Sequence, residues 1–570
     1  MELSLEQIRR HKLPAGLAAY KKLQQDTANP MEVNESLLMK LLKDNQDTEY
    51  GRKYNFAGIH SVEDYQKYVP VTRYDDYAGY ILDMTERGQK DLITAYDVIY
   101  YCETSGTMGN PKLLPLTDKS LEVFMTYNVD YINGFLLEKL GEGWVDGRCM
   151  SLIEAKIDTL KNGLQVGPVS SKMVWGARPY LKYLYTAPEE VMFPSPDTNT
   201  RYLHARFGLM DGNITGISSS FCSYVLEIMR YIEKNHQLLV SDIGKGTIDK
   251  SIKMSPLVRA SLMEKVAPMP ERAQKLRKIF AQGFETPVMP RLWPRLMYLD
   301  GVGTGCFAGY ARKLRERYMG NDIDFYMWGI NASEGLFSIP FELNCGDGVL
   351  VPGSMFYEFL PIEAGDDFSQ IVTLDKLETS RIYEIILTNL SGFYRYRMRD
   401  AVRVVGRYKN TPTIQFEYRI DQTVDILDDH TTEIALSTAA ENTAKELGFD
   451  LVDFSVYPDR DSSPTRYIYV MEIGKRPDTA TYNHIRDCLD RQLAIVNPYL
   501  GEIIGKGLCG ATVLKISQEE TYLLYRDLMF MKGRSTAQLK PVRIIQNEFQ
   551  RRFFFGLIEE TVEKMAANDK

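Results

Sequence analysis

The 570-residue sequence has few of the residues that bind structural metals or form disulfide bonds. Its seven cysteines stand singly, without a Cys-x-x-Cys pair, and their odd number argues against a complete disulfide framework. Its six histidines are dispersed and show no zinc-ligand spacing. These absences exclude the zinc-ribbon and disulfide-stapled classes, and we expect the thiols to be reduced.

The sequence also lacks an excess of positive charge and any long apolar run. Its formal net charge is −8 and its pI is near 5.6, whereas a general nucleic-acid binder is normally basic. No stretch approaches the ~20 apolar residues of a membrane span, and the first residues lack the apolar core of a signal peptide. We therefore expect a cytoplasmic protein with no nucleic-acid partner and no membrane association.

The chain is longer than one hydrophobic core usually serves, so it should divide into two or more domains. Residues 120–300 alternate helical and strand patterns without repeats, which is typical of a large α/β domain. Shorter patterns near the C-terminus predict a small α+β domain. Its expected elements are a helix at Thr432–Leu447 ending at Gly448, strands at Leu451–Tyr457 and Tyr467–Ile473, and a helix near Tyr482–Ile495.

Several N-terminal elements can also be placed from the pattern of apolar residues. Glu35–Leu42 has helical spacing, and Asn34 is positioned to be its N-cap. Ile217–Leu226 is typical of a strand end that feeds a helix. Leu292–Tyr298 predicts a strand, and the glycines at Gly301–Gly305 predict a turn after it.

The first stretch with chemical content follows an apolar strand at Val98–Tyr101. The strand breaks into glycines and hydroxyls and ends on a lysine, a combination suited to polyphosphate because exposed backbone N–H groups form an anion-binding nest. The glycine spacing of the kinase-type P-loop is absent, and a plain turn before Pro111 is the alternative. The candidate phosphate-binding residues are Thr104, Ser105, Gly106, Thr107, Gly109 and Lys112.

A second stretch, Phe325–Gly335, is an apolar strand that ends in polar residues. Asn331, Ser333 and Glu334 stand at its end, where a carboxylate beside a phosphate loop suits Mg²⁺ bound through nucleotide phosphates. We assign Glu334 to the metal, and Asn331 and Ser333 to the nucleotide. The alternative is a strand-terminal turn with a solvated glutamate.

The third stretch runs from Gly392 to Asp421. Aromatic and basic residues alternate up to Arg399, which predicts a strand with one cationic face. Asp400 would end this strand, placed to accept hydrogen bonds from a ribose diol. A charged β-hairpin without a ligand is the alternative.

The glycine–hydroxyl stretch resembles the phosphate loop of the acyl-adenylate-forming superfamily, the firefly luciferase and acyl-CoA ligase group. That loop reads Ser/Thr-Ser-Gly-Thr-Thr-Gly-x-Pro-Lys, and Thr104 to Lys112 departs from it only at Met108. Within the superfamily, the chain resembles the Gretchen Hagen acyl-acid amido synthetases, first known as auxin-responsive plant proteins. Their lead-in motifs, Asn-x-x-Thr-Glu-Tyr and Val-Pro-x-x-x-Tyr, are matched by Asn45–Tyr50 and Val69–Tyr74.

The later motifs of this branch also occur in order. Tyr-x-x-Ser-Glu is matched at Ser333 and Glu334, with Ile330 in place of the tyrosine that would stack on adenine. Phe-Glu-Phe-Leu-Pro resembles Met355–Pro361. Tyr-Arg-Tyr-Arg-x-Gly-Asp is matched through Asp400, with Arg399 in place of the glycine. Arg419-Ile-Asp421 resembles the Gly-Arg-x-Asp hinge motif, and Gly533–Arg543 resembles the segment of a C-terminal lysine, here Lys540, with the spacing to the proline shifted by one residue.

The resemblance implies an α/β fold with a large adenylating domain of mixed β-sheets and flanking helices, residues 1–421, and a small mobile α+β domain, residues 422–570. It implies an ATP- and Mg²⁺-dependent ligase that converts a carboxylic acid into an acyl-adenylate and transfers the acyl group to an amine, and the expected amine is an amino acid. Lys540 and Lys112 would be catalytic, Arg419 would reach the nucleotide, and Asp421 would mark the hinge. We expect a monomer.

Two alternatives to this function stay open at the level of the sequence. One is an acyl-CoA ligase of the same superfamily, which shares the first half-reaction. The other is a non-catalytic binding relative, which the departures at Met108, Ile330 and Arg399 would suit.

Overall fold

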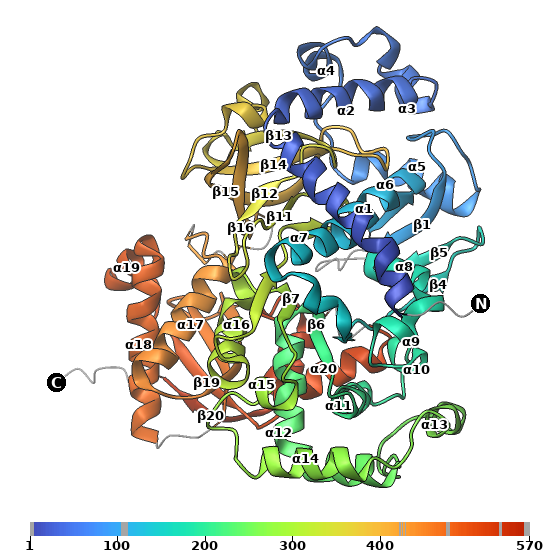
Figure 1. The fold of residues 1–570 in the computed structure, drawn as a ribbon. Coiled ribbons are helices and arrows are strands. Elements are labelled where there is room, and N and C mark those ends of the chain that lie inside the picture. Colours follow the sequence, from blue (N-terminus) through green and yellow to red (C-terminus); the bar gives the residue numbers. More distant parts are fainter. Residues whose placement is uncertain are drawn as a thin grey trace, which may run out of the picture. The chain divides into compact units, whose positions relative to one another are not determined.

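The computed structural model describes residues 5–103, 112–420, 423–424, 426–427, 429–474, 479–534 and 539–563. The chain folds into two compact units, Met1–Phe416 and Glu417–Lys570 (Figure 1). Both units combine helices with β-sheets, so the predicted α/β class is confirmed. The predicted boundary after Asp421 falls on a residue outside the described part of the chain.

The first unit contains a sheet of four parallel strands, in the order β3-β6-β7-β8. Because the strands are parallel, their carboxyl ends meet at one edge, where ligands bind in open α/β sheets. The strand β6 passes directly into the long helix α12 (Cys222–Lys245), as the sequence predicted. The strands are β3 (Arg148–Ser151), β6 (Ile214–Phe221), β7 (Tyr298–Val302) and β8 (Asp324–Met327).

The strand predicted at Leu292–Tyr298 is wrong. Leu292 ends the short helix α15 (Met289–Leu292), and a turn at Pro294 precedes β7, which begins only at Tyr298. Proline has no N–H for a strand ladder, and the buried Trp293 donates its indole N–H to the Gly208 carbonyl, 3.0 Å away. The predicted glycine turn likewise begins only after β7 ends at Val302.

The first unit also contains two further sheets. A four-stranded sheet has the order β2-β1-β5-β4, and a six-stranded antiparallel sheet has the order β11-β12-β16-β15-β14-β13. The first comprises β1 (Val98–Glu103), β2 (Leu113–Thr117), β4 (Asp158–Thr159) and β5 (Gln165–Gly167). The second comprises β11 (Ser338–Ile339), β12 (Gly348–Leu350), β13 (Phe356–Pro361), β14 (Ile382–Thr388), β15 (Tyr396–Tyr408) and β16 (Thr411–Arg419). The strands predicted at Val98–Tyr101 and Met355–Pro361 are therefore present.

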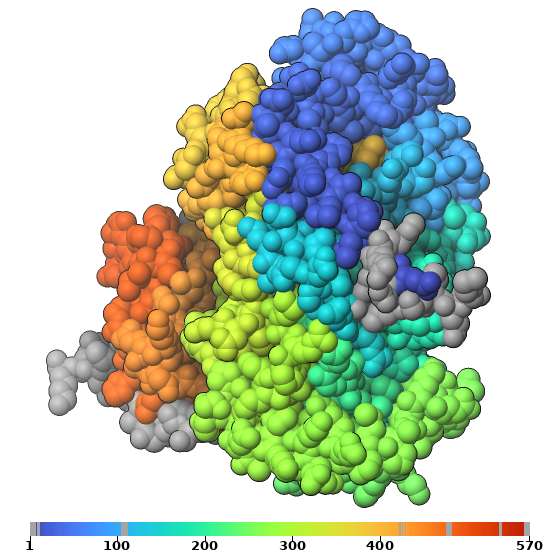
Figure 2. Space-filling model, viewed as in Figure 1, coloured from blue at the N-terminus to red at the C-terminus, as the bar shows by residue number. Residues whose placement is uncertain are grey.

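Two N-terminal helices, α1 (Leu5–Asp26) and α2 (Pro30–Asp44), cover part of the first unit. In Figure 2 the dark-blue α1 lies beside the cyan α7 (Tyr131–Leu140) on the surface. The two helices approach closely because Gly16 and Gly134 face each other. A Cβ atom on Gly134 would lie 2.1 Å from the Gly16 carbonyl oxygen.

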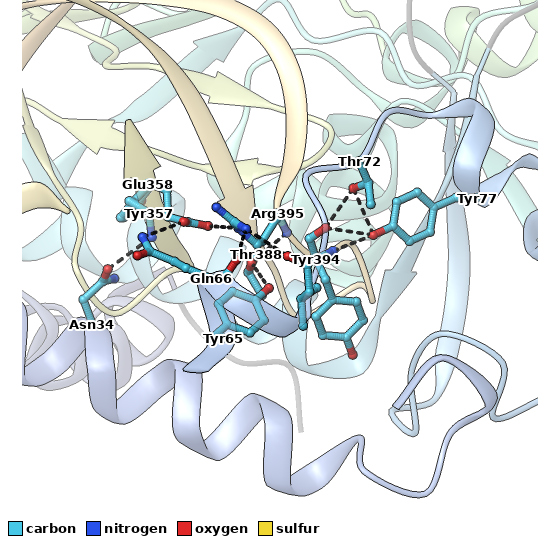
Figure 3. Close-up of polar contacts among 11 residues, drawn as sticks. Asn34, Tyr65, Gln66, Thr72, Tyr77, Tyr357, Glu358, Thr388, Tyr394 and Arg395 are labelled. Atoms are coloured by element: carbon cyan, nitrogen blue, oxygen red, sulfur yellow. Dashed lines mark hydrogen bonds and ion pairs between the residues drawn. The ribbon is translucent and has the colours of Figure 1, made fainter. Parts of the chain in front are cut away.

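The expected N-cap role of Asn34 is wrong, because α2 begins four residues earlier. Pro30 is the first residue of α2, a position where the missing proline N–H costs nothing. Asn34 is instead buried within the helix. Its amide donates to the carbonyls of Pro352 (2.8 Å) and Met355 (2.7 Å) and accepts from the Tyr357 N–H (3.1 Å), which fastens α2 to the start of β13 (Figure 3).

The segment Val69–Tyr74 pairs with the beginning of β15. The Thr72 N–H donates to the Arg395 carbonyl and the Arg397 N–H donates to the Thr72 carbonyl, both at 2.9 Å. The hydroxyls of Thr72 and Tyr77 both donate to the Tyr394 carbonyl, at 2.8 and 3.0 Å (Figure 3). This motif therefore serves as scaffold for the strand that carries Asp400.

The predicted cationic face is absent, because Arg395, just before β15, and Arg397, within it, are paired with buried acids. Arg395 Nε lies 3.0 Å from Glu358, and its Nη1 donates to the carbonyls of Gln66 and Val69. Arg397 makes a bidentate pair with Glu384, at 3.0 and 2.6 Å. Burying an unpaired guanidinium would be costly, so each arginine needs its carboxylate.

The second unit contains a four-stranded sheet in the order β17-β18-β19-β20. Its first helix, α17 (Glu433–Leu447), has Thr432 as N-cap and ends at Gly448, whose φ is +69°. The predicted helix and its glycine cap are thus confirmed, as are the two predicted strands and the second helix. The remaining elements are β17 (Leu451–Asp459), β18 (Arg466–Ile473), α18 (Thr479–Val496), α19 (Pro498–Gly505), β19 (Val513–Ser517), α20 (Thr521–Met531), α21 (Glu548–Phe555) and β20 (Ile558–Val562).

We predict that Glu358→Gln strongly destabilises the first unit. The Arg395 and Glu358 side chains are 6% and 1% exposed, and loss of one partner of such a pair costs about 3–5 kcal/mol. The matched control is Glu363→Gln, because the Glu363–Arg381 pair is 59% and 33% exposed and should be worth at most about 1 kcal/mol. Thermal unfolding would measure both. Equal melting temperatures for the two variants would contradict the prediction.

Candidate active site

Glu334 lies in the turn of a small hairpin beyond the carboxyl end of β8. The hairpin strands are β9 (Asn331–Ala332) and β10 (Gly335–Leu336). The strand predicted up to Asn331 therefore stops at Met327, and the polar residues form a separate turn. Asn389 fixes this turn, because its amide donates to the Glu334 carbonyl at 2.8 Å.

Glu334 also lies close enough to the end of β1 to influence Cys102 electrostatically. Burial, and next the Glu334 charge, raise the pKa of the Cys102 thiol. Cys102 is the penultimate residue of β1, and the glycine–hydroxyl stretch follows immediately. The candidate metal ligand thus stands beside the strand that leads into the candidate phosphate-binding residues. Of those residues, Thr104, Ser105, Gly106, Thr107 and Gly109 lie outside the described part of the chain.

Lys112, the last residue of that stretch, is exposed and rests on the ring of Tyr74. Its Nζ lies 5.2 Å from the ring centroid, within range of a cation–π interaction. The Tyr74 hydroxyl also receives the Leu113 N–H at 3.0 Å. The last tyrosine of the Val69–Tyr74 segment therefore supports the end of the candidate phosphate loop.

Of the other candidates on the hairpin, Asn331 already has a polar contact. Its amide donates to Asn128 Oδ1 at 2.7 Å, so it belongs to an exposed polar pair in the described chain. Ser333 lies in the hairpin turn next to Glu334. Ile330 occupies the place of the expected tyrosine, and its N–H is held by the Ser338 hydroxyl at 3.0 Å.

Asp400 lies within β15, so the prediction that it ends the strand is wrong. Between the paired positions Ile386–Arg397 and Glu384–Ala401, β14 advances by two residues and β15 by four. The surplus residues form a bulge, a feature frequent next to active sites. Asp400 is buried in this bulge.

Arg399 at the bulge has φ +68°, the left-handed region that glycine enters without steric cost. This explains why the amido synthetase motif has glycine at the matching position. The Arg399 guanidinium is also 3.5 Å from Glu384. The departure from the motif therefore changes the side chain while the backbone keeps the conformation that the motif requires.

The second unit begins at Glu417 and so includes the last residues of β16. Its candidates Arg419 and Lys540 share a neighbour that the sequence did not reveal. Burial raises the pKa of Glu433, the first residue of α17, and the charges of Lys540, Arg543 and Arg419 oppose this rise. Arg419 and Lys540, which are 121 positions apart (540 − 419), are thus brought to one carboxylate. An acidic residue directly after a helix N-cap is common, so the sequence around Glu433 did not indicate a functional role.

Lys540 itself is exposed and lies just before an anchored segment. The Val456 N–H on β17 donates to the Arg543 carbonyl at 2.7 Å, and the Ile545 N–H donates to the Val456 carbonyl at 2.8 Å. The lysine therefore lies three residues before the first residue of the segment that pairs with β17 (543 − 540).

The sequence reading missed a buried carboxyl at the carboxyl end of the parallel sheet. Asp300, on β7, accepts hydrogen bonds at Oδ1 from the Ser218 hydroxyl (2.8 Å) and the Trp328 indole N–H (3.1 Å). Burial raises the pKa of Asp300 to about 7, although both hydrogen bonds act to lower it. An acidic residue inside an apolar strand was the available signal.

In the described part of the chain, no three histidine, cysteine or acidic residues come together as a metal cluster. A single carboxylate at Glu334 nevertheless fits Mg²⁺, which is bound by one or two carboxylates together with substrate phosphates and water. The described helices also include none that is long and apolar enough to cross a membrane.

The sequence of this chain matches all three domains of one enzyme family. The GH3 family N-terminal domain matches residues 19–323, its central domain residues 348–419 and its C-terminal domain residues 435–548. The fold is that of adenylate-forming ligases: 2-hydroxyisobutyryl-CoA ligase has a TM-score of 0.52 at 12% identity, covering 95% of this chain and 91% of the ligase. The chain belongs to the GH3 family, which confirms the predicted resemblance.

Relatives within the family align over nearly their whole lengths. The probable indole-3-acetic acid-amido synthetase GH3.11 of Oryza sativa subsp. japonica is 27% identical over 93% of this chain and 94% of its own. The 4-substituted benzoates-glutamate ligase GH3.12 of Arabidopsis thaliana is 26% identical over 92% and 95%. The solved GH3.15 acyl acid amido synthetase has a TM-score of 0.83 at 24% identity, covering 96% of this chain and 97% of that structure.

We predict that Asp300→Asn changes how stability depends on pH. An unfolded aspartate titrates near pH ~4, so between about pH 4 and 7 the folded protein retains a proton that the unfolded chain has lost. Wild-type stability should therefore fall as pH rises through this window, with a slope of up to about 1.4 kcal/mol per pH unit.

Asparagine can accept the same two hydrogen bonds at Oδ1 and does not titrate. The melting temperature of Asp300→Asn relative to wild type should therefore increase from pH 5 to pH 8. Asp322→Asn, at an exposed position, controls for the loss of one charge. A difference for Asp300→Asn that stays constant with pH would refute the assignment of a titrating buried carboxyl.

Proposed function

We propose that this GH3 family member activates a carboxylic acid with ATP and transfers the acyl group to the amine of an amino acid. The observation that carries the proposal is the position of Glu334 beside the end of β1, which leads into the glycine–hydroxyl stretch. It is supported by the amido synthetases and ligases among the relatives. These proteins act on small molecules, and one chain carries every residue assigned below, so a monomer suffices.

The reaction proceeds in two steps. A carboxylate oxygen of the acid attacks the α-phosphorus of ATP, the bond to the β-phosphate oxygen breaks, and pyrophosphate leaves. The amine nitrogen then attacks the acyl carbon of the adenylate, the bond to AMP breaks, and the nitrogen loses a proton. Neither step needs a nucleophile on the enzyme, so catalysis rests on positioning and on stabilising charge at the α-phosphate.

The residues are assigned to this chemistry by their types and positions. Glu334 holds Mg²⁺, which when bound offsets phosphate charge, and Lys112 adds a positive charge at the end of the phosphate loop. Asp400 accepts the ribose hydroxyls and Arg419 contacts the nucleotide. Asn331 and Ser333 line the same turn as Glu334. The backbone and hydroxyls of the loop, Thr104, Ser105, Gly106, Thr107 and Gly109, bind the phosphates.

The two parts of the chain have separate tasks in this proposal. Residues 1–421 bind ATP and the acid, and residues 422–570 move about Asp421 to bring Lys540 to the nucleotide during adenylation. Closure excludes water from the reactive adenylate.

The proposal is tested by incubating the protein with ATP, Mg²⁺ and a panel of acids that includes indole-3-acetic acid and 4-substituted benzoates. AMP formation that requires an amino acid is the expected result. AMP formation that requires CoA would instead identify an acyl-CoA ligase. Absence of acid-dependent AMP formation and of pyrophosphate exchange would favour a non-catalytic relative.

We predict that Glu334→Gln abolishes most adenylation while the fold survives, because glutamine keeps the shape but not the charge that holds Mg²⁺. Pyrophosphate exchange at limiting Mg²⁺ should fall by about 10²-fold or more. Glu342→Gln, which removes an exposed partner of Lys139, is the matched control and should exchange normally. Wild-type exchange by Glu334→Gln at limiting Mg²⁺ would rule out the metal assignment.

We predict that Lys540→Ala slows adenylate formation by about 10²–10³-fold, because a positive charge at the α-phosphate is lost. ATP binding, measured by calorimetry, should change little. The second half-reaction should be spared when a synthetic acyl-adenylate is supplied, since pyrophosphate has already left. Lys506→Ala, which removes an exposed lysine paired with Glu502, is the control. Normal adenylation by Lys540→Ala would show that Lys540 is an ordinary surface lysine.

A further inference from the structure

The buried carboxyl of Asp300 has no task in the reaction proposed above. It occupies the same register as Ser218 on β6 and Tyr326 on β8, two residues before the carboxyl end of β7. Paired residues of parallel strands point to the same face, so Asp300 shares its face with these side chains. It is therefore placed at the edge of the sheet where ligands bind.

The orientation of the Asp300 carboxyl is fixed at only one oxygen. Both hydrogen bonds, from Ser218 and from Trp328, arrive at Oδ1. Within the described ranges, no residue donates a hydrogen bond to Oδ2, and the side chain retains slight exposure. Oδ2 is therefore the carboxyl oxygen that is left available to a hydrogen-bond donor from outside the chain.

The surroundings of Asp300 connect it to the candidate active site. The backbone N–H of Trp328 donates to the carbonyl of Gly301, the residue after Asp300, at 2.9 Å. The segment that leads to Glu334 is therefore held beside Asp300 where it begins. Six residues separate Trp328 from Glu334 (334 − 328). The segment that carries Glu334 therefore starts next to Asp300.

The same edge also carries a stacked pair of aromatic rings. Phe221 ends β6 and stacks on Phe307, with ring centroids 4.6 Å apart and planes 5° from parallel. A bulge in β6 pairs Phe221 with Val302, two positions beyond Asp300, which places Phe221 on the face of Asp300. Apolar walls with a few placed polar groups are typical of sites for small organic ligands.

We propose that Asp300 is a specificity-determining residue for the acyl acid: Oδ2 accepts a hydrogen bond from a hydroxyl or amino substituent at the end of the acid remote from its carboxylate. The inference rests on the proposed acid-activating function and adds a substrate class to it. That class is an acid with an apolar, ring-containing body and a distal hydrogen-bond donor. Ser218 and Trp328 are positioning residues, because they hold Oδ1 and thereby direct Oδ2.

The test compares acids of equal size that differ only in the distal group. At pH 8, kcat/KM for adenylation is measured with benzoates and 3-phenylpropionates that carry a 4-hydroxyl, 4-amino, 4-methyl or 4-nitro group. Wild type should favour the hydroxyl and amino acids over the methyl acids by at least about tenfold, because a bound methyl acid would cover Oδ2 without donating a hydrogen bond to it. Binding of the same acids is measured by calorimetry as a readout independent of turnover.

The informative variant is Asp300→Asn, which can keep both bonds at Oδ1 but presents N–H₂ where Oδ2 was. The preference should then shift by at least about tenfold from donor to nitro acids, since the site now donates. Ser218→Ala is the control for a purely structural role. It loses one bond to Oδ1 but keeps Oδ2, so it should retain the order of preference even where its overall activity is lower.

Each outcome bears on one claim. Equal rates with hydroxyl, amino and methyl acids in wild type would overturn the assignment of Asp300 while leaving the acid-activating function intact. An unchanged order of preference in Asp300→Asn, in rate and in binding, would overturn it as well. AMP formation with none of the acids, nor with those of the wider panel, would instead count against the proposed function.

Discussion

The buried ion pair between Arg395 and Glu358 joins segments that are far apart in the sequence. Gln66, on the short helix α4 (Val62–Tyr68), donates to the same carboxylate at 2.9 Å, and the Arg395 guanidinium is held by the carbonyls of Gln66 and Val69. Because the Arg395 and Glu358 side chains are buried, each requires the partners that satisfy it. The contact fixes where β15 begins. The bulge at Asp400 follows five positions later (400 − 395), so its position depends on this anchor.

The motifs of the GH3 family thereby divide into scaffold and site. The Val69–Tyr74 segment and the strand β13 contribute side chains to the buried network around Arg395 and Thr72. Tyr74 belongs to both groups, because it pairs with the backbone of Leu113 and lies under Lys112. A motif residue therefore need not contact a ligand to be required. It suffices that it fixes the strand or loop on which a ligand-binding residue stands.

Local sequence predicted the elements whose signals are themselves local. The helix α17 could be placed because a threonine cap and a glycine at φ +69° bound an apolar pattern. The role of Asn34 could not be predicted, because its amide forms hydrogen bonds with three backbone groups more than 300 positions away. The ion pairs of Arg395 and Arg397 are equally non-local. An alternation of aromatic and basic residues specifies a strand but not which acids will face it.

In the candidate site, too, the sequence predicted residues that stand in motifs and missed residues that do not. Glu334, Asp400 and Lys540 were found because each stands in a motif with a known order along the chain. Asp300 and Glu433 stand in none, and their significance comes from what surrounds them: a serine and an indole for Asp300, and three positive charges for Glu433. Burial acts on both carboxyls in the same direction, because a charge removed from water is disfavoured whatever its role. The two carboxyls differ in the charge of the groups around them. Glu433 already has positive charges to offset its own. The described chain gives Asp300 neutral hydrogen-bond donors at one oxygen, an arrangement that a ligand with its own donor would complete.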